Sequence, residues 1–281
     1  RVCTLLKQVC DCKILLGGPE VSYDSKQLMQ KHLFIDYIVV GEGEQTLKEL
    51  LGGLDLEQIN GLCWRSGNTI INNSPRSPIP DLDLIQAPYN ENELVALKGK
   101  IIYYETSRGC PYNCSYCLSS SIKGVRNFSL ERVKKDLLML MKYGVSLVKL
   151  VDRTFNADSK RSESILRFIL EHNKKTCFHF EIAADTLTDE IMTLLENAPE
   201  GYFQIEAGVQ SINERTLKAV NRHMKLDVLS DNVLRLRKNG NVHIHLDLIA
   251  GLPYEDFESF KNSFNEVIKL LHQALQLGFL K

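Results

Sequence analysis

The sequence predicts an α/β protein in two parts, a short open α/β sheet followed by an incomplete parallel (β/α)6 barrel of the TIM type. Three observations lead to this prediction. Short apolar runs recur along the chain, amphipathic stretches of helical period separate them, and a proline-rich segment divides the series in two. A chain of 281 residues with 44% hydrophobic residues is long enough to bury the core of such a fold.

The first part is expected over residues 1–60. Apolar strands are predicted at Lys13–Leu16 and Tyr37–Val40, and each is followed by a glycine-containing turn and a helix, over Ser25–His32 and Gln45–Leu51. This βαβα order is typical of half of an open α/β sheet. Because the chain starts with Arg and enters a strand almost at once, we expect further residues upstream.

A connector is predicted over residues 61–98. It begins with a predicted hairpin, Leu62–Arg65 and Thr69–Asn72 around a Ser-Gly-Asn turn. Four prolines then fall within a short span: Pro75, Pro78, Pro80 and Pro88. Prolines at this density favour extended chain over helix or central strand.

The second part, over residues 99–281, repeats a strand and a helix without interruption. The predicted strands are Ile101–Thr106, Leu147–Val151, Phe178–Ile182, Phe203–Ala207 and His243–Leu248. The predicted helices are Leu130–Tyr143, Ser159–Asn173, Thr188–Asn197, Asn213–Val220, Asp227–Asn239 and Tyr254–Leu275. Right-handed crossovers between parallel strands would roll these units into a partial barrel. Residues Leu277–Lys281 are predicted as a sixth strand cut short, so the barrel is expected to be truncated at its C-terminus.

Composition narrows the function classes. The net charge is −1, and the pI is near 6.7, which predicts no broad surface for nucleic acid or anionic lipid. No apolar run is long enough to span a membrane and no secretory signal opens the chain, so we predict a cytoplasmic protein. Eight cysteines are too few for a disulfide-stapled domain, which leaves them as free thiols or metal ligands.

Three cysteines follow the first barrel strand in a C-x3-C-x2-C spacing: Cys110, Cys114 and Cys117. Catalytic groups of parallel barrels lie on loops at the carboxyl ends of the strands, where this motif falls. Four cysteines are the ordinary ligands of a [4Fe–4S] cluster, so three would leave one iron open to an external ligand. Structural zinc is the alternative, although it normally takes four protein ligands.

The motif and the strands after it resemble the radical S-adenosylmethionine (SAM) superfamily from Ile101 to the C-terminus. The resemblance implies a [4Fe–4S] cluster and SAM as cofactors, and reductive cleavage of SAM to a 5′-deoxyadenosyl radical. It also implies a reductant such as flavodoxin or ferredoxin and a small-molecule substrate, which the sequence does not identify. Tyr116, the aromatic residue before the last cysteine, corresponds to the family's residue beside the adenine.

Polar residues follow the later strands at the positions where the family binds SAM. Asp152, Arg153 and Thr154 end the second strand, where the family carries Gly-Gly-Glu. The blocks after the next three strands resemble the oxygen-independent coproporphyrinogen oxidase branch, and by that resemblance SAM would contact Glu181, Gln210, Arg222 and Asp247, with Glu206 as a second candidate for the ribose. Each of them could instead be a structural polar residue. His243 and His245 share one face of the fifth strand, where packing in the barrel interior or a substrate contact would each explain them, and packing is favoured. Arg161 is expected at the surface.

The N-terminal part resembles the C-terminal half of a Rossmann-like cobalamin-binding domain. The resemblance rests on Leu16–Ser22 and Asp36–Glu44, two glycine-rich segments after strands. It implies cobalamin in the full-length protein, whose Asp-x-His-x-x-Gly ligand motif would lie upstream; a generic Rossmann-like turn is the alternative. The whole chain is most similar to cobalamin-domain radical SAM proteins of the magnesium-protoporphyrin cyclase type.

Two other functions remain open at this point. A scaffold or electron-transfer protein would bind an iron–sulfur cluster or zinc without cleaving SAM. A tRNA methylthiotransferase would normally need a second three-cysteine set and a basic tail, neither of which occurs in this sequence. The favoured prediction is therefore a radical SAM enzyme, either an iron–sulfur oxidoreductase or a cobalamin-dependent methyltransferase.

Overall fold

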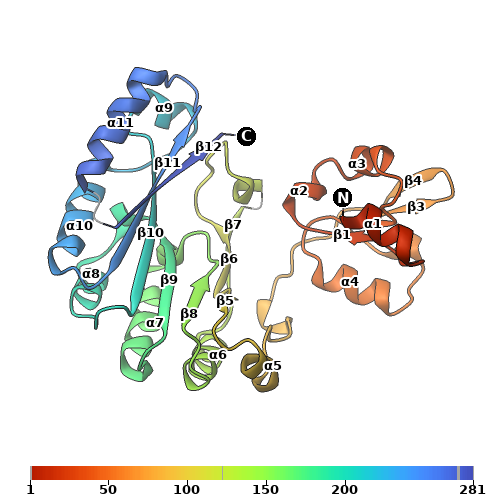
Figure 1. The fold of residues 1–281 in the computed structure, drawn as a ribbon, viewed down its shortest axis with the longest axis horizontal. Helices are drawn as coiled ribbons and strands as arrows, with labels where there is room; N and C mark the ends of the chain where they lie inside the picture. Colours follow the sequence, from red (N-terminus) through yellow and green to blue (C-terminus); the bar gives the residue numbers. More distant parts are fainter. Residues whose placement is uncertain (1, 122, 271–272, 281) are drawn as a thin grey trace. The chain divides into compact units, whose positions relative to one another are not determined.

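The computed structural model describes residues 2–121, 123–270 and 273–280 (Figure 1). The chain divides into two compact units, Arg1–Asp81 and Leu82–Lys281. This division falls inside the segment 61–98 that the prolines mark as a connector. No helix in the described ranges is both long and apolar enough to cross a membrane.

The first unit is built on a small mixed sheet. Its strands, in the order in which they pair, are β1 (Leu15–Leu16), β2 (Tyr37–Val39), β3 (Leu62–Ser66) and β4 (Thr69–Asn72). Its helices are α1 (Val2–Val9), α2 (Pro19–Ser22), α3 (Ser25–Lys31) and α4 (Glu44–Leu51), with the 3-10 turn η1 (Leu56–Gln58). The first pair of strands is parallel, and β3 and β4 add an antiparallel hairpin to it. The predicted hairpin therefore belongs to the sheet, and α1 is an element that the sequence did not indicate.

Alternation along β3 explains how the hairpin is held. Leu62 and Trp64 pack on one face of the sheet with Ile59, whereas Cys63 packs on the other with Ile38. Both faces are thus covered, and a one-residue slip of the hairpin would exchange the two sets of side chains.

The second unit is an α/β structure with a six-stranded parallel sheet, in which strands lie in the order β12-β11-β10-β9-β8-β5. The strands are β5 (Ile101–Tyr104), β8 (Leu147–Leu150), β9 (Cys177–Ile182), β10 (Phe203–Gln210), β11 (His243–Ala250) and β12 (Ala274–Phe279). The helices are α5 (Glu91–Ala96), α6 (Leu130–Lys142), α7 (Ser159–His172), α8 (Asp189–Glu196), α9 (Glu214–Ala219), α10 (Leu226–Asn239) and α11 (Phe257–Leu270). Figure 1 shows α8, α10 and α11 along the outer side of the sheet.

Shorter elements complete the second unit. They are the antiparallel ribbon β6 (Ser107–Cys110) and β7 (Gly124–Asn127) and the 3-10 turns η2 (Leu82–Leu84), η3 (Leu118–Ser121), η4 (Phe155–Ala157) and η5 (Ala184–Thr186). The ribbon was not predicted, because its residues show no alternation of apolar and polar side chains.

The two faces of the central strands differ in polarity. In β10 the residues Phe203, Ile205, Ala207 and Val209 are buried, and the residues between them are half-buried. Strand β11 repeats the pattern with His245 and Asp247 on the half-buried face. Apolar residues therefore face the helices, and the polar residues of both strands line the inner face of the sheet.

The sixth strand differs from its predicted bounds. We expected a helix as far as Leu275 and a strand over Leu277–Lys281, but α11 ends at Leu270 and β12 already begins at Ala274. Leu275 pairs with Leu246 of β11, so it belongs to the strand. Leucines at this point fit a helical period and a buried strand equally well, which is why the pattern misled. Residues 271–272 and 281 lie outside the described part of the chain.

Candidate active site

An open cleft lies at the carboxyl ends of the parallel strands, and counted out to its mouth it encloses about 740 Å³. Every residue predicted for the site lines it except Asp152: Cys110, Cys114, Tyr116, Cys117, Arg153, Thr154, Glu181, Glu206, Gln210, Arg222 and Asp247. The structure therefore brings together residues from strand ends that are more than a hundred positions apart in sequence.

The cysteine loop runs between β6 and β7 and is anchored from far along the chain. Ser115 N donates to Val220 O at 3.0 Å, and the Asn221 side chain donates to Asn113 O at 3.0 Å. Asn221 adopts a φ of 53°, which few residue types tolerate as readily as Asn. The segment after α9 thus acts as a clamp that fixes the loop over the cleft.

Glycine is required in β6, the strand that leads into the cysteine loop. Gly109 has a φ of 105°, and a Cβ atom there would lie 2.1 Å from Gly124 O on the opposite strand of the ribbon. Gly124 has a φ of 83° but open space around its missing Cβ atom. A side chain at Gly109 would therefore clash with the opposite strand, whereas a side chain at Gly124 would meet only the cost of a positive φ.

Gly109→Ala is expected to break the β6–β7 ribbon and lower the iron–sulfur content of the protein severalfold, because the ribbon begins the cysteine loop. The Gly124→Ala variant carries only the cost of positive φ, about 1 kcal/mol, and should keep its iron. Iron and sulfide assays after anaerobic reconstitution compare the two variants. Equal iron content in both would show that the close approach at Gly109 does not position the loop.

Asp152 lies beneath the cleft and not in it. Its carboxylate accepts hydrogen bonds from Thr106 N at 3.0 Å, Thr106 Oγ1 at 2.7 Å and Ser107 Oγ at 2.5 Å. Burial raises the pKa of Asp152 against the lowering effect of these bonds. Thr154, two residues on, does line the cleft, with Oγ1 3.5 Å from Cys110 Sγ. Asp152 thus holds the start of the cysteine loop from the neighbouring strand.

Arg222 brings its guanidinium close to one of the cysteines. Its Nη2 donates to Gly208 O at 2.5 Å, and its Nη1 lies 3.9 Å from Cys114 Sγ. Gly208 leaves room for this arrangement, since a Cβ atom there would lie 2.1 Å from Gln210 Nε2. Gln210 itself has a φ of 70° at a β-bulge, where the pairing of β10 with β11 shifts register. The Gln210 side chain and the Arg222 guanidinium both lie close to Gly208.

Several polar atoms of the cleft have unmet hydrogen-bonding capacity. Gln210 Oε1, Arg222 Nε and Asp247 Oδ1 are buried and have no hydrogen-bond partner among the described residues. Buried polar atoms are normally paired, so unpaired ones in a cleft indicate a polar ligand. Donors and acceptors both occur in this set, as a zwitterionic amino acid derivative requires.

The carboxyl groups of Glu181, Glu206 and Asp247 line the cleft, and their pKa values differ. A hydrogen bond from His179, at 3.2 Å, and the Lys149 ammonium at 3.4 Å lower the pKa of Glu206 to about 2. Burial and the Glu206 charge raise the pKa of Asp247 to about 8, and they also raise that of Glu181. At neutral pH the cleft therefore presents one firmly ionised carboxylate and one carboxyl group that retains its proton.

The raised pKa of Asp247 predicts a pH-dependent stability. The folded state binds this proton more tightly than the unfolded state, whose pKa is near 3.8, so the contribution is complete below about pH 4 and is lost as pH rises to about 8. Asp247→Asn should flatten the dependence of the melting temperature over this window, with its advantage over the parent growing up to pH 8. The exposed Asp227→Asn variant is the control, and parallel curves for Asp247→Asn and the parent would contradict the assignment.

Sequence analysis missed several residues of the site. Tyr112 lines the cleft between the first two cysteines, a position that the motif itself could have indicated. His179 and Lys149 lie behind Glu206, and finding them needs the register of three strands. Arg161, expected in solvent, is half-buried and donates from Nη2 to Thr106 O at 3.0 Å, so the surface prediction was wrong.

Comparison with known proteins places these features in a family. The model of the radical SAM superfamily matches residues 104–267, more than half of the chain. An uncharacterized methyltransferase of Pyrococcus horikoshii is 28% identical over 92% of the chain and 58% of its own length. The anaerobic magnesium-protoporphyrin IX monomethyl ester cyclase of Synechocystis is 27% identical over 93% of the chain and 53% of its length. The chain thus spans little more than half the length of these relatives.

Solved structures show the same fold. The radical SAM methyltransferase TsrM from Kitasatospora setae aligns over 99% of the chain and 57% of its own, with a TM-score of 0.77 and 18% identity. The cobalamin-dependent SAM radical enzyme OxsB aligns over 97% of the chain and 41% of its own, with a TM-score of 0.69 and 18% identity. The family match over residues 104–267, which include the cysteine motif after the first strand of the parallel sheet, makes this chain a member of the radical SAM superfamily.

Proposed function

We propose that Cys110, Cys114 and Cys117 hold a [4Fe–4S] cluster with one open iron and that SAM binds in the cleft against that iron. The observation that carries the proposal is the convergence of three free thiols with unpaired polar atoms of Gln210 and Arg222 in one cleft. The family as a whole uses this cluster and SAM, and the donor set here fits both.

The spacing of the sulfur atoms favours a cluster over a single zinc ion. Across residues 2–121, 123–270 and 273–280, one group of three His, Cys, Asp or Glu side chains has its ligand atoms all within 4.8 Å of one another. The three cysteines are not in that group, so their sulfur atoms are not all this close together. Tetrahedral zinc with bonds of about 2.3 Å needs sulfur atoms about 3.8 Å apart. A four-iron cluster binds each thiolate to a different iron and needs wider spacing.

The side chains of the cleft have distinct roles in this proposal. Arg222 and Gln210 would bind the carboxylate and amino ends of SAM, Tyr116 would lie beside the adenine, and Glu206 would accept hydrogen bonds from the ribose. The remaining contacts carried over from the family are Arg153, Thr154, Glu181 and Asp247. When bound, the cluster and SAM supply reductive cleavage of the S–C5′ bond to methionine and a 5′-deoxyadenosyl radical. In this proposal the cleft holds the reacting atoms together.

We infer two partners for the intact protein. Flavodoxin or ferredoxin would deliver the electron, and a small molecule would be the substrate.

Cobalamin would bind the first unit, where Gly17 and Gly18 follow β1 and Gly41 follows β2 at the same edge of two parallel strands. A Cβ atom on Gly18 or Gly41 would meet no atom within 4 Å, so this edge leaves room for a ligand. One relative is named as a cobalamin-dependent radical SAM methyltransferase, which supports a methyl-transfer or cyclase type of reaction.

Anaerobic reconstitution with iron and sulfide tests the cluster and SAM together. Electron paramagnetic resonance (EPR) of the reduced protein should show a [4Fe–4S] signal that shifts when SAM is added, and dithionite should then drive release of 5′-deoxyadenosine. A cluster signal that does not change when SAM is added, with no release of 5′-deoxyadenosine, would support the scaffold or electron-transfer alternative instead.

A further inference from the structure

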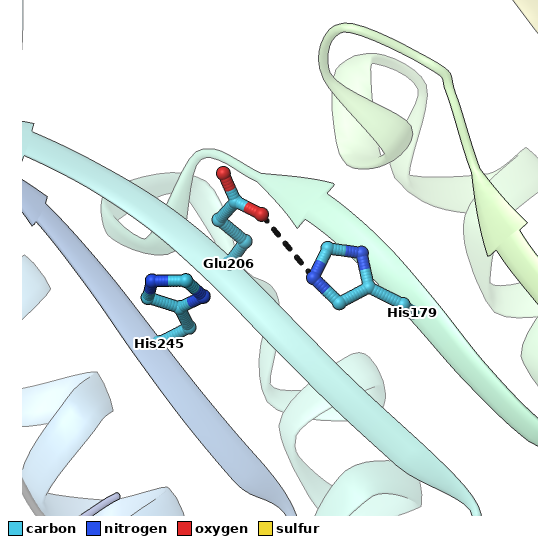
Figure 2. Close-up of side chains that lie close together, drawn as sticks. All are labelled: His179, Glu206 and His245. Atoms are coloured by element: carbon cyan, nitrogen blue, oxygen red, sulfur yellow. Dashed lines mark ion pairs between the residues drawn. The ribbon is translucent and has the colours of Figure 1, made fainter. Parts of the chain in front are cut away.

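A second cluster of ligand-type side chains lies on the inner face of the sheet. Figure 2 shows Glu206 of β10 between His179 of β9 and His245 of β11. The Nε2 atom of His179 is 3.2 Å from Glu206 Oε2, and one ligand atom from each of the three residues lies within 4.8 Å of the other two. Within the described ranges this is the only such group. We propose that His179, Glu206 and His245 bind a divalent transition-metal ion.

The strand register explains why the three side chains meet. Glu206 pairs directly with His245, and His179 pairs with Gln204, two residues before Glu206 on the same face of β10. Side chains two apart on a strand point the same way, so all three face the interior of the barrel. Each residue lies on a different strand of a continuous parallel sheet. A site built on three paired strands keeps its geometry better than one built on loops.

Burial and charge also favour a cation at this place. The side chains of His179 and Glu206 are only 9% and 14% exposed, and His245 Nε2 lies 3.6 Å from Asp247 Oδ1. That oxygen is buried without a hydrogen-bond partner among the described residues. The carboxylate of Glu206 therefore has a second carboxyl group beside it, that of Asp247, and a divalent ion bound here would favour the ionised form of both.

Lys149 supplies the positive charge in the structure, with Nζ 3.4 Å from Glu206 Oε2. Its side chain is 32% exposed, so the ammonium can move outward when a metal ion takes its place. The contacts of Glu206 with Lys149 and His179 both use Oε2, which leaves Oε1 for the ribose of SAM. The metal site and the proposed SAM site are therefore compatible.

The donor set indicates which ions would bind. Two imidazoles and one carboxylate suit Fe²⁺, Mn²⁺ or Zn²⁺, and three protein ligands leave positions open for water or a substrate oxygen. The open positions would face the interior of the barrel below the SAM site. A ligand with a hydroxyl or carboxylate group could therefore be held there while the radical forms above it.

Mn²⁺ binding to the reconstituted protein tests the proposal. The oxidised [4Fe–4S] cluster has no EPR signal, and Mn²⁺ has low affinity for thiols, so loss of the free Mn²⁺ spectrum reports oxygen and nitrogen ligands. After treatment with EDTA to remove loosely held metal, the parent should bind about one Mn²⁺ per chain at saturation. His179→Gln and His245→Gln should each weaken binding at least about tenfold.

His243→Gln is the matched control, because His243 lies on the same strand but is exposed and outside the cluster. It should bind Mn²⁺ as the parent does. The half-buried His245 can be replaced with less risk to folding than His179, and circular dichroism checks each variant. Absence of saturable binding by the parent, or equal binding by His245→Gln, would overturn the proposal. The readout is Mn²⁺ binding, so failure of SAM cleavage in the parent would bear only on the proposed function.

Discussion

Replacing Cys114 by Ala is expected to abolish both the [4Fe–4S] cluster and SAM-dependent release of 5′-deoxyadenosine. A three-cysteine site has no spare protein ligand, so loss of one thiolate leaves only two of the four irons with a protein ligand. Cys114 is also the buried member of the set, at 4% exposure, so solvent cannot replace its sulfur easily. Iron content, the EPR spectrum and the nucleoside assay measure the loss.

Cys177→Ala provides the control for this experiment. Cys177 is a half-buried thiol at the start of β9, at the opposite end of the strand from the cleft. Its variant should retain the iron content and the nucleoside release of the parent. Retention of a SAM-sensitive cluster by Cys114→Ala would show that other ligands hold the iron and that the assignment of the motif is wrong.

Asp152→Ala is expected to destabilise the protein by about 3 kcal/mol and to reduce cluster content. Three donors, one of them a backbone amide, would be left without an acceptor in a buried place, and each such hydrogen bond contributes about 1 kcal/mol. The donors belong to Thr106 and Ser107, which lead into the cysteine loop. Urea unfolding under anaerobic conditions gives the free energy of unfolding.

Asp158→Ala is the comparison, since Asp158 caps helix α7 by accepting a hydrogen bond from Arg161 N at 3.1 Å. Loss of an N-cap costs about 1 kcal/mol and should leave the cluster intact. If both variants lost the same stability and both kept their iron, Asp152 would have no special part in holding the loop.

The sequence predicted the fold well where the spacing of apolar residues fitted a strand or a helix but not both. Buried parallel strands such as Phe178–Ile182 stand out as short apolar runs between amphipathic helices, and the structure confirms a parallel six-stranded sheet. The pattern failed around Leu275, where leucines satisfy the helical and strand periods alike. It also failed for the β6–β7 ribbon, whose geometry depends on Gly109 and has no hydrophobic signature.

Those residues of the candidate site that belong to short motifs could be predicted from the sequence. The spacing of the cysteines is local, so it can be read without a structure. The position of Asp152 below the cleft follows from the direction of one side chain at a strand end, which the motif does not reveal. The grouping of His179 with His245 depends on the register of three strands, and the sequence had favoured packing for His245 over a substrate contact.

The clamp on the cysteine loop has a consequence for biosynthesis. Asn221 holds Asn113 across 108 positions of sequence, and Arg222 approaches Cys114 across the same separation. A ribosome adds about 5–20 residues per second, so the thiols emerge roughly 5–20 s before the residues that anchor them. Closing such a long loop also costs entropy that only the finished sheet repays. Insertion of the proposed cluster is therefore expected to be a late event, and carriers that deliver iron and sulfide would find an ordered acceptor only after β10 and α9 have folded.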